Sequence, residues 1–553
     1  MVGIISFIAF TAIVAIFAYM STRNTDETTS DGYFLGGRSL GAITIAGSLL
    51  LTNLSTEQIV GLNGAAYNHG ILVMAWETFA AVAMIVTAIF LLPRYLKGGI
   101  ATVPTFLARR FDTMTKTMVS ALFLSGYVVV LLPIVLYSGA LAFITMFDLE
   151  ALLGMDKTAC LWVCVWVIGL IGSIYAIFGG LKAVAVSDLI NAVGLMIGGL
   201  LIPIFGLMAI GDGSISAGLS TITAANPEMY NAIGSPTSEI PFSTIFTGMM
   251  LVQLFYWGTN QAIIQRALGA SSLQEGQKGL VLASFIKILG PLIVVLPGLI
   301  AFHMFQGELA NGDEAYPALV KEVLPAPLLG FFAAVIFGAI MSSFNSALNS
   351  SVTLFGLDIY KEHFNKDATE EQVVKAGKTF GIVLAVLAMF IAPFIANAPD
   401  GLFGYLQEVN GCYSIPILTI IVVGFATKYV PAIAAKIALW SGVVLYSISQ
   451  FILKPIMAGR AADAVDTTGM TEAAAEAAIA LAEKSAYPHF LHVMAILFVL
   501  NVIIMLVIGK LKPREEAYVQ NYTEDVDITP WSLVKPIGAL ICLTVVGVYM
   551  YFS

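Results

Sequence analysis

The stretch LLTNLSTEQIVG, residues 50–61, brings six polar side chains together inside an otherwise apolar region. ITIAGSLL precedes the polar residues, and the apolar run ILVMAWETFAAVAMIVTAIFLLP follows at residues 71–93. Burying a single amide or hydroxyl without a partner costs roughly 2–7 kcal/mol. The polar run therefore predicts a functional interruption of a membrane-spanning helix.

The composition is that of a membrane protein. Hydrophobic residues make up 58% of the 553 residues and charged residues only 11%, whereas soluble domains carry roughly 25% charged residues. The net charge of −9 and the absence of a basic run in the sequence give no indication of a nucleic-acid partner. The four cysteines lie in apolar segments without a neighbouring histidine, which is typical of small buried side chains. We expect an all-α polytopic membrane protein.

The apolar segments predict about 14 transmembrane helices, since each needs about 20 apolar residues. They are centred near residues 11, 51, 82, 131, 168, 197, 252, 290, 341, 385, 413, 443, 499 and 542. Most of the 26 Lys and Arg residues fall in odd-numbered loops, and cytoplasmic loops are the ones enriched in these residues. We therefore expect both termini on the outer side. The outer segment TEAAAEAAIALAEKSA, residues 471–486, predicts a short external helix.

A second polar interruption, YWGTNQ at residues 256–261, lies five predicted helices after the first. Two polar breaks in corresponding spans indicate an inverted-repeat transporter with discontinuous second and seventh helices. Unwound backbone at mid-membrane is tolerated only where it lines a cavity or binds an ion.

Five ionisable residues fall within predicted spans, where such residues usually mark a substrate or ion route. They are Glu57, Glu77, Asp188, Lys287 and Glu408. The alternative for each one is a structural ion pair that fixes helix packing. Lys287 needs a partner of opposite charge, and Glu77 on the third predicted span is the candidate.

The ninth predicted span contains GAIMSSFNSALNSS, residues 338–351, in which Ser342, Ser346 and Ser350 share one helix face. One interpretation is close helix packing through small residues. The other is an ion site, in which the hydroxyls of Ser342 and Ser343 and three carbonyls of an unwound helix supply five uncharged oxygens. Such a set favours Na⁺ over divalent cations, which usually recruit carboxylates.

With these segments the chain resembles the solute:sodium symporter family, specifically its sodium/glucose cotransporter branch, over nearly its whole length. The resemblance is carried by DGYFLGGRSLG (31–41), TNLSTEQIVG (52–61), FGGLKAVAVSD (178–188), FYWGTNQAIIQRAL (255–268) and SSFNSALNSSVTLFGLDIYKE (342–362). It implies a five-plus-five inverted-repeat (LeuT-type) core in one transmembrane domain, residues 1–553. Repeat one would cover about residues 40–211 and repeat two about 240–427. Residues 1–20 and about 432–553 would form peripheral helices.

The resemblance also implies roles for individual residues. Co-transported Na⁺ would be held by carbonyls of Leu51, Leu54 and Ala339 and by the hydroxyls of Ser342 and Ser343, with Asp188 along the inner cation path. The substrate would be bound by Asn53, Gln58, Glu77, Gln253, Tyr256, Trp257, Asn260, Lys287 and Gln407. The outer apolar gate would consist of Leu62, Trp76 and Phe403, and Tyr256 backed by Trp257 would be the inner gate. Gln253 and Ala80 replace the Asn and Ser of sugar-binding members, which changes the hydroxyls that the site can recognise.

These residue types suit a sugar. A hexose presents hydroxyls that donate and accept hydrogen bonds, and an apolar face of C–H groups. Amides and a Lys/Glu pair supply both donors and acceptors, and an aromatic ring covers the apolar face. We expect Na⁺-coupled symport of a galactose- or glucose-like monosaccharide across the plasma membrane, with a bacterial inner membrane as the expected location.

Three alternatives stand beside this hypothesis. The same scaffold carries another small polyol, a uronate or an organic anion; or the protein is a passive channel; or it is an intramembrane enzyme. A channel needs a continuous lined pore, whereas the polar residues here cluster at mid-depth. The sequence has no HExxH, GxSxG or paired-Asp motif, so we do not expect an enzyme.

Overall fold

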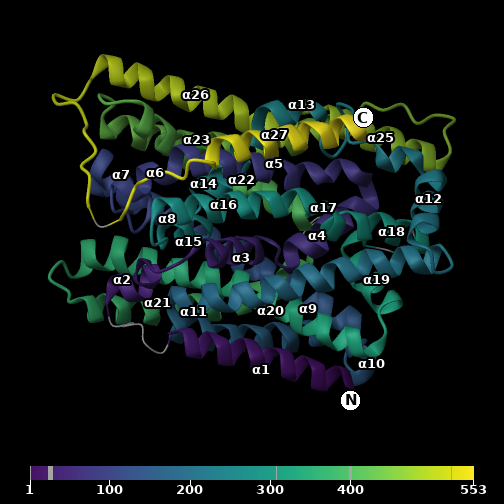
Figure 1. Cartoon of the computed structure of the whole chain (residues 1–553). Coiled ribbons are helices and arrows are strands. Elements are labelled where there is room, and N and C mark those ends of the chain that lie inside the picture. Colours follow the sequence, from purple (N-terminus) through teal and green to yellow (C-terminus); the bar gives the residue numbers. More distant parts are fainter. Residues whose placement is uncertain (1, 23–28, 307, 310, 398–401, 525) are drawn as a thin grey trace.

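The structure, a computed structural model of the chain, describes residues 2–22, 29–306, 308–309, 311–397, 402–524 and 526–553. These residues form helices, and extended pairing among them is limited to two isolated bridges, Leu40 with Ala270 and Ser272 with Asp527. Most helices run along one common direction, as in a membrane bundle (Figure 1). The predicted all-α class is confirmed.

The helices of the bundle differ widely in length. The longer ones are α1 (Val2–Thr22), α9 (Leu132–Phe147), α11 (Lys157–Ile210), α16 (Leu273–Leu289), α20 (Ala326–Thr353), α21 (Glu370–Ile391), α22 (Leu402–Ala426), α23 (Ala432–Ile448), α26 (Phe490–Leu511) and α27 (Val534–Tyr551), and α8 (Thr113–Gly126) leads into α9. The shorter ones that matter for the site are α3 (Ala42–Asn53), α4 (Thr56–His69), α5 (Ala75–Val86), α7 (Val103–Arg110), α14 (Met250–Gly258) and α15 (Gln261–Leu268). The segment predicted to form a short helix does so as α25 (Glu472–Ser485).

The predicted number of 14 spans is not confirmed. Within the described residues, ten helices are long and apolar enough to cross a membrane, or eleven if the bent pair Leu273–Leu289 and Pro291–Phe305 is one span. The spans predicted near residues 168 and 197 correspond to two candidate spans, Lys157–Ile174 and Leu181–Ile210, which both belong to the helical element α11. Helix α3, at the second predicted span, is too short to cross the membrane alone because it ends at the polar run.

Helix α3 lies inside the bundle, where it packs against α11, α16 and α20. Figure 1 shows α3 at the centre of the molecule, with α4 continuing from it toward one end. Its residues from Ile45 to Asn53 are all buried. The polar stretch that interrupts this helix is therefore surrounded by protein, which is the condition for breaking a helix at membrane depth.

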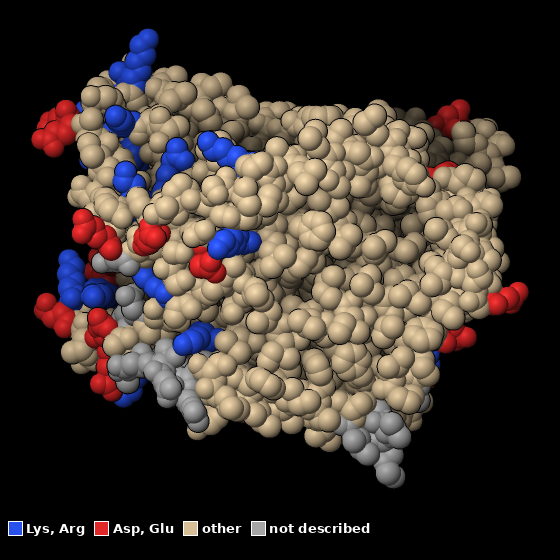
Figure 2. All heavy atoms as spheres, in the orientation of Figure 1, with Lys and Arg blue, Asp and Glu red and all other residues tan. Residues whose placement is uncertain are grey.

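The two ends of the bundle differ in charge. In Figure 2 the visible Lys and Arg side chains gather at the left end of the molecule, whereas the right end shows mainly Asp and Glu. Helix α1 begins and α27 finishes toward that right end (Figure 1). The two termini thus share one side of the bundle, opposite the side rich in basic residues.

Candidate functional site

The first helix break lies between α3 and α4. Leu54 has φ −77° and ψ 56°, and Ser55 is extended, so neither residue continues the helix. Helical hydrogen bonding resumes when Ile59 N donates to the Ser55 carbonyl at 2.8 Å. The break leaves backbone groups at the end of α3 and the start of α4 free to bind other partners.

The second break lies between α14 and α15, at Thr259 and Asn260. Tyr95 Oη donates to the Gly258 carbonyl at 3.1 Å, which satisfies one group freed by the interruption. Asn260 Oδ1 accepts from Ala262 N at 3.0 Å and from Tyr127 Oη at 2.8 Å, and thereby caps α15. The predicted discontinuity of the second and seventh helices is confirmed.

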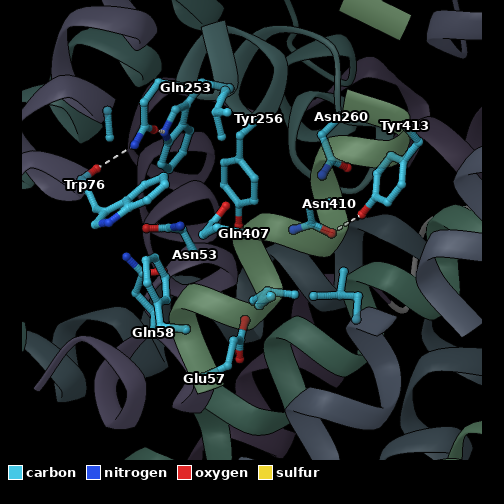
Figure 3. Close-up of a pocket in the computed structure, with 16 residues that line it drawn as sticks. Asn53, Glu57, Gln58, Trp76, Gln253, Tyr256, Asn260, Gln407, Asn410 and Tyr413 are labelled. Atoms are coloured by element: carbon cyan, nitrogen blue, oxygen red, sulfur yellow. Dashed lines mark hydrogen bonds between the residues drawn. The ribbon is translucent and has the colours of Figure 1, made fainter. Parts of the chain in front are cut away.

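A small cavity of about 50 Å³ lies between the two breaks (Figure 3). This volume holds several waters, each of which needs roughly 10–15 Å³, but it is too small for a monosaccharide. The cavity is lined by Asn53, Glu57, Gln58, Trp76, Ala80, Leu131, Val252, Gln253, Tyr256, Trp257, Asn260, Phe403, Leu406, Gln407, Asn410 and Tyr413. Amides and aromatic rings dominate this lining.

Most of the predicted substrate residues lie in the cavity wall. These are Asn53, Gln58, Gln253, Tyr256, Trp257, Asn260 and Gln407. Trp257 Nε1 donates to Gln253 Oε1 at 3.1 Å, and Gln253 Nε2 donates to the Trp76 carbonyl at 2.8 Å, so these side chains hold one another in place. The ring centroids of Tyr256 and Trp257 are 5.2 Å apart in an edge-on contact.

Glu77 and Lys287 pair with each other behind the wall and do not line the cavity. Lys287 Nζ is 2.7 Å from both carboxylate oxygens of Glu77, and both side chains are fully buried. Gln58 Nε2 donates to Glu77 Oε1 at 2.7 Å. The Gln58 amide, which lines the cavity, thus connects the cavity to the ion pair by a hydrogen bond.

Two of the three predicted outer-gate residues touch. Trp76 and Phe403 pack edge to face with centroids 5.2 Å apart, and both line the cavity. Phe403 also lines a larger vestibule of about 800 Å³, so its ring lies between the two spaces. A Cβ on Gly61 would approach Phe403 Cβ to 2.8 Å, and this glycine therefore permits close packing of α4 on α22. Leu62 is buried but lies outside both linings.

The predicted Na⁺ ligands lie where α3 meets α20. Ser343 Oγ donates to the Thr52 carbonyl at 2.8 Å, and Thr52 Oγ1 is 3.1 Å from Ser346 Oγ. Ser342 Oγ is buried on the side of α20 that faces Asp188. Hydroxyls of α20 therefore face the backbone freed by the first break. The other predicted ligands, the carbonyl-bearing residues Leu51, Leu54 and Ala339, are buried.

Asp188 lies directly beside these hydroxyls. Ser48 Oγ donates to Asp188 Oδ2 at 2.6 Å, and Arg266 Nε donates to Ser48 Oγ at 3.1 Å. Arg266 also donates to Ser346 Oγ and to the Ala262 carbonyl. Asp188 and Ser342 line a further cavity of about 240 Å³ between α1, α11 and α20. A chain of polar groups thus connects the α3–α20 contact to that cavity.

Sequence reasoning missed several polar residues of the site. Asn410 and Tyr413 line the cavity from α22, where the Tyr413 hydroxyl donates to Asn410 Oδ1 (Figure 3). The sequence pattern that could have identified Asn410 is its spacing from Gln407, because residues three apart share one helix face. Arg266, in the last turn of α15, is fully buried.

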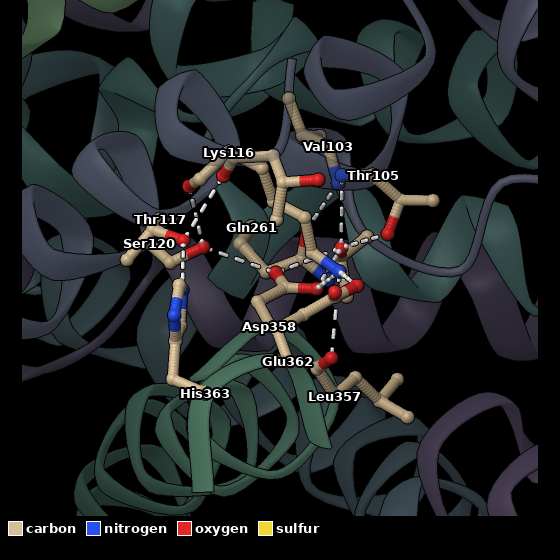
Figure 4. A network of polar contacts seen from close by, with 12 residues as sticks. Val103, Thr105, Lys116, Thr117, Ser120, Gln261, Leu357, Asp358, Glu362 and His363 are labelled. Atoms are coloured by element: carbon tan, nitrogen blue, oxygen red, sulfur yellow. Dashed lines mark hydrogen bonds and ion pairs between the residues drawn. The ribbon is translucent and has the colours of Figure 1, made fainter. Parts of the chain in front are cut away.

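A buried polar network holds the far side of the second break. Lys116 of α8 lies 3.2 Å from Asp358 Oδ1 and donates to Glu362 Oε1 at 2.8 Å (Figure 4). Asp358 also accepts from Thr102 Oγ1 at 3.0 Å and from Ser120 Oγ at 3.1 Å. Asp358 and Glu362 belong to η8 (Leu354–Phe364), a π-helical continuation of α20. Nearby, Gln261 Oε1 accepts from Val103 N at 2.9 Å, which ties α15 to α7.

Two broken helices around a central cavity, with hydroxyls facing one break, are the architecture of a secondary transporter. The sequence model of the sodium:solute symporter family matches residues 33–444. The chain belongs to this family, and Na⁺ is the co-transported ion. It is a multi-pass membrane transporter and not an enzyme.

Two curated relatives and one solved structure illustrate the similarity. The chain is 45% identical to the uncharacterized symporter YidK of Escherichia coli (strain K12) over 546 residues, which cover 99% of this chain and 90% of YidK. It is 34% identical to the sodium/glucose cotransporter of Vibrio parahaemolyticus over 438 residues, 75% of this chain and 78% of that protein. A substrate-bound, outward-open Na⁺-coupled sialic acid symporter superposes with a TM-score of 0.75 at 20% identity, over 93% of this chain and 99% of that chain. This likeness confirms the LeuT-type fold.

Proposed function

We propose that the protein carries a galactose- or glucose-like monosaccharide together with Na⁺ across a bacterial inner membrane by alternating access. The observation that carries this proposal is the cavity between the two helix breaks, whose polar wall consists mainly of amides beside an aromatic ring, Tyr256. Amides donate and accept hydrogen bonds as sugar hydroxyls do. The similarity to a sodium/glucose cotransporter supports the same substrate class.

In this proposal the sugar contacts Asn53, Gln58, Gln253, Asn260 and Gln407 and stacks on Tyr256, with Trp257 behind the ring. Glu77 and Lys287 do not touch the substrate directly. They position Gln58, because the Gln58 amide donates a hydrogen bond to Glu77. Phe403, Trp76 and Leu62 close the outer path, and Tyr256 closes the inner one. Because the cavity is smaller than a monosaccharide, the ring of Phe403 must move when substrate enters from the vestibule.

The binding of Na⁺ and the binding of sugar are coupled because both ligands contact the last turn of α3. Leu51 and Leu54, the proposed carbonyl ligands of Na⁺, flank Asn53, whose side chain lines the cavity. When Na⁺ binds these carbonyls together with Ser342, Ser343 and Ala339 of α20, it fixes the same turn that presents Asn53 to the sugar. Each ligand then raises the affinity for the other by the same factor. Asp188 lies on the inner route along which Na⁺ leaves.

The orientation and the repeats belong to the same proposal. The end of the bundle rich in Lys and Arg faces the cytoplasm, so both termini lie on the outer side. Residues 40–211 and 240–427 form the two repeats, and residues 1–20 and 432–553 form peripheral helices.

Uptake into proteoliposomes tests the proposal. Purified protein is reconstituted, an inward Na⁺ gradient is imposed, and labelled hexoses, pentoses, polyols and uronates are offered singly. We expect accumulation of a hexose that requires the Na⁺ gradient and stops when Na⁺ is equal on both sides. Accumulation of a non-sugar substrate alone, or hexose entry without Na⁺ dependence, would contradict it.

A further inference from the structure

Glu57 is an acidic residue in the cavity wall, next to the break between α3 and α4. It lies in the first turn of α4, is 5% exposed and lines the central cavity (Figure 3). Its Oε2 atom is buried and makes no hydrogen bond to any described residue. A buried carboxylate normally has a cation or several donors around it, because an unpaired buried charge is costly. The helix start and Ser55 therefore stabilise this carboxyl group in part, and Oε2 remains without a hydrogen bond within the described part of the chain.

Glu57 carries the single acidic or basic side chain among the described residues that line the cavity. The two buried cations nearest in the architecture are already engaged. Lys287 is bound by both oxygens of Glu77, and Arg266 donates to Ser48, Ser346 and Ala262. The cavity thus offers a substrate one acidic side chain and uncharged amides, and no basic side chain among the described residues.

The position of Glu57 explains how a carboxylate can be held there. The start of a helix carries a partial positive charge of roughly half a unit from its free N–H groups. In inverted-repeat transporters the start of a broken helix is directed at an anionic group of the substrate. Here the protein places its own carboxylate at the start of the 14-residue helix α4. A carboxylate on the substrate would meet a site that already holds an anion.

We infer that Glu57 is a specificity-determining residue, which makes the cavity accept neutral and amino sugars and reject uronates and other anionic substrates. This inference rests on the proposed sugar transport and names its substrate class. The carboxylate accepts hydrogen bonds from sugar hydroxyls or from an ammonium group, both of which can donate to the part of Glu57 that lines the cavity. An anionic substrate supplies no such donor with its charged group and is repelled across the short distance of a closed cavity.

Competition for Na⁺-driven uptake tests the inference. The labelled hexose that the protein accumulates competes with its unlabelled form, with its uronate and with its 2-amino analogue, for example galactose, galacturonate and galactosamine. In the wild-type protein we expect the uronate to inhibit at least about tenfold more weakly than the hexose, and the amino sugar to inhibit at least as well as the hexose. A wild-type protein that accepts the uronate as well as the hexose would overturn the inference while leaving sugar symport intact.

The variant Glu57→Gln keeps the shape of the side chain and removes its charge. We expect the ratio of uronate to hexose inhibition constants to fall about tenfold in this variant, and the preference for the amino sugar to disappear. The matched control is Glu408→Gln, because Glu408 lines the vestibule, pairs with Lys454 at 2.6 Å and lies outside the central cavity. Unchanged ratios in Glu57→Gln, or an equal shift in Glu408→Gln, would contradict the role of Glu57.

Binding measurements keep the test decisive if Glu57→Gln fails to transport. The melting temperature of the detergent-solubilised proteins is measured in Na⁺ with each of the three sugars. The wild type should be stabilised by the hexose and the amino sugar but not by the uronate, and Glu57→Gln should gain stabilisation by the uronate. Equal stabilisation of the wild type by all three would overturn the inference. Absence of Na⁺-driven uptake of every sugar, with a carboxylate taken up instead, would overturn both the inference and the proposed function.

Discussion

Lys287 Nζ lies 2.7 Å from both carboxylate oxygens of Glu77, and neither side chain is accessible to solvent. The pair satisfies the electrostatic need of a lysine inside the membrane. It also contacts the cavity wall, since Glu77 Oε1 accepts from Gln58 as well. The ion pair predicted from the sequence is therefore present. It does not line the cavity, however, because the side chain of Gln58 lies between Glu77 and the cavity.

Removing one partner of this pair should unfold the protein more easily than removing both. Lys287→Ala leaves a buried carboxylate uncompensated, which costs about 3–5 kcal/mol, whereas neutral replacement of both partners is often harmless. We expect Glu77→Gln with Lys287→Met to recover most of the melting temperature but little of the Na⁺-driven sugar uptake, because Gln58 loses its charged acceptor. Melting temperature and uptake are measured across the full double-mutant cycle. Full recovery of transport in the double variant would remove the pair from the substrate site.

Ser343→Ala should weaken the dependence on Na⁺. Ser343 Oγ faces the Thr52 carbonyl at the first break, and loss of one oxygen from a set of about five should cost about 1–3 kcal/mol of ion affinity. The Na⁺ concentration for half-maximal uptake then rises about 5- to 150-fold. Ser351→Ala is the control, since Ser351 Oγ bonds only the Ala347 carbonyl of its own helix. Equal Na⁺ activation of wild type and Ser343→Ala would argue strongly against the ion site.

Phe403→Ala should open the cavity to the vestibule. Its ring separates the two spaces and packs on Trp76 at 5.2 Å. With Ala80→Cys placed in the cavity wall of a protein without its native cysteines, a membrane-impermeant thiol reagent should react faster once the ring is removed. Tyr405→Ala, which changes the vestibule but not the cavity, should leave the rate unaltered. Equal rates in both variants would show that Phe403 is not the barrier.

The proposed orientation is tested with single cysteines at the two ends of the bundle. Lys366→Cys should be labelled only from the cytoplasmic side, and Asn311→Cys only from the outer side. Inside-out and right-side-out vesicles with an impermeant reagent distinguish the two faces. The reverse pattern would show that the basic end of the molecule faces outward.

The interruptions of the helices were predictable because a cluster of polar residues inside an apolar run is costly to bury in lipid and is tolerated where a broken helix lines a cavity. Leu54–Ser55 and Thr259–Asn260 break the helices where the sequence indicates. The pairing of Lys287 with Glu77 followed from the need of a buried charge for a partner. These features depend on local composition and on one strong electrostatic requirement.

Other features depend on packing that sequence patterns do not encode. Asn410 and Tyr413 reach the cavity from α22, where no helix break marks a site. The buried guanidinium of Arg266 donates to Ser48, Ser346 and Ala262, and each of the three lies far from it or on another turn, so no local pattern reveals this site. The order of layers, with Gln58 in the wall and Glu77 behind it, likewise follows from how α4 and α5 pack.

The most direct test of the central claim is whether a sugar gradient alone can drive Na⁺. Proteoliposomes containing the wild-type protein are given equal Na⁺ on both sides, labelled Na⁺ outside and an inward gradient of the transported hexose. Because coupled binding is reciprocal, we predict transient accumulation of labelled Na⁺ above its equilibrium value, which disappears when the sugar is equal on both sides and is strongly reduced in Ser343→Ala. Entry of labelled Na⁺ that is the same with and without the sugar gradient would contradict Na⁺-coupled sugar symport.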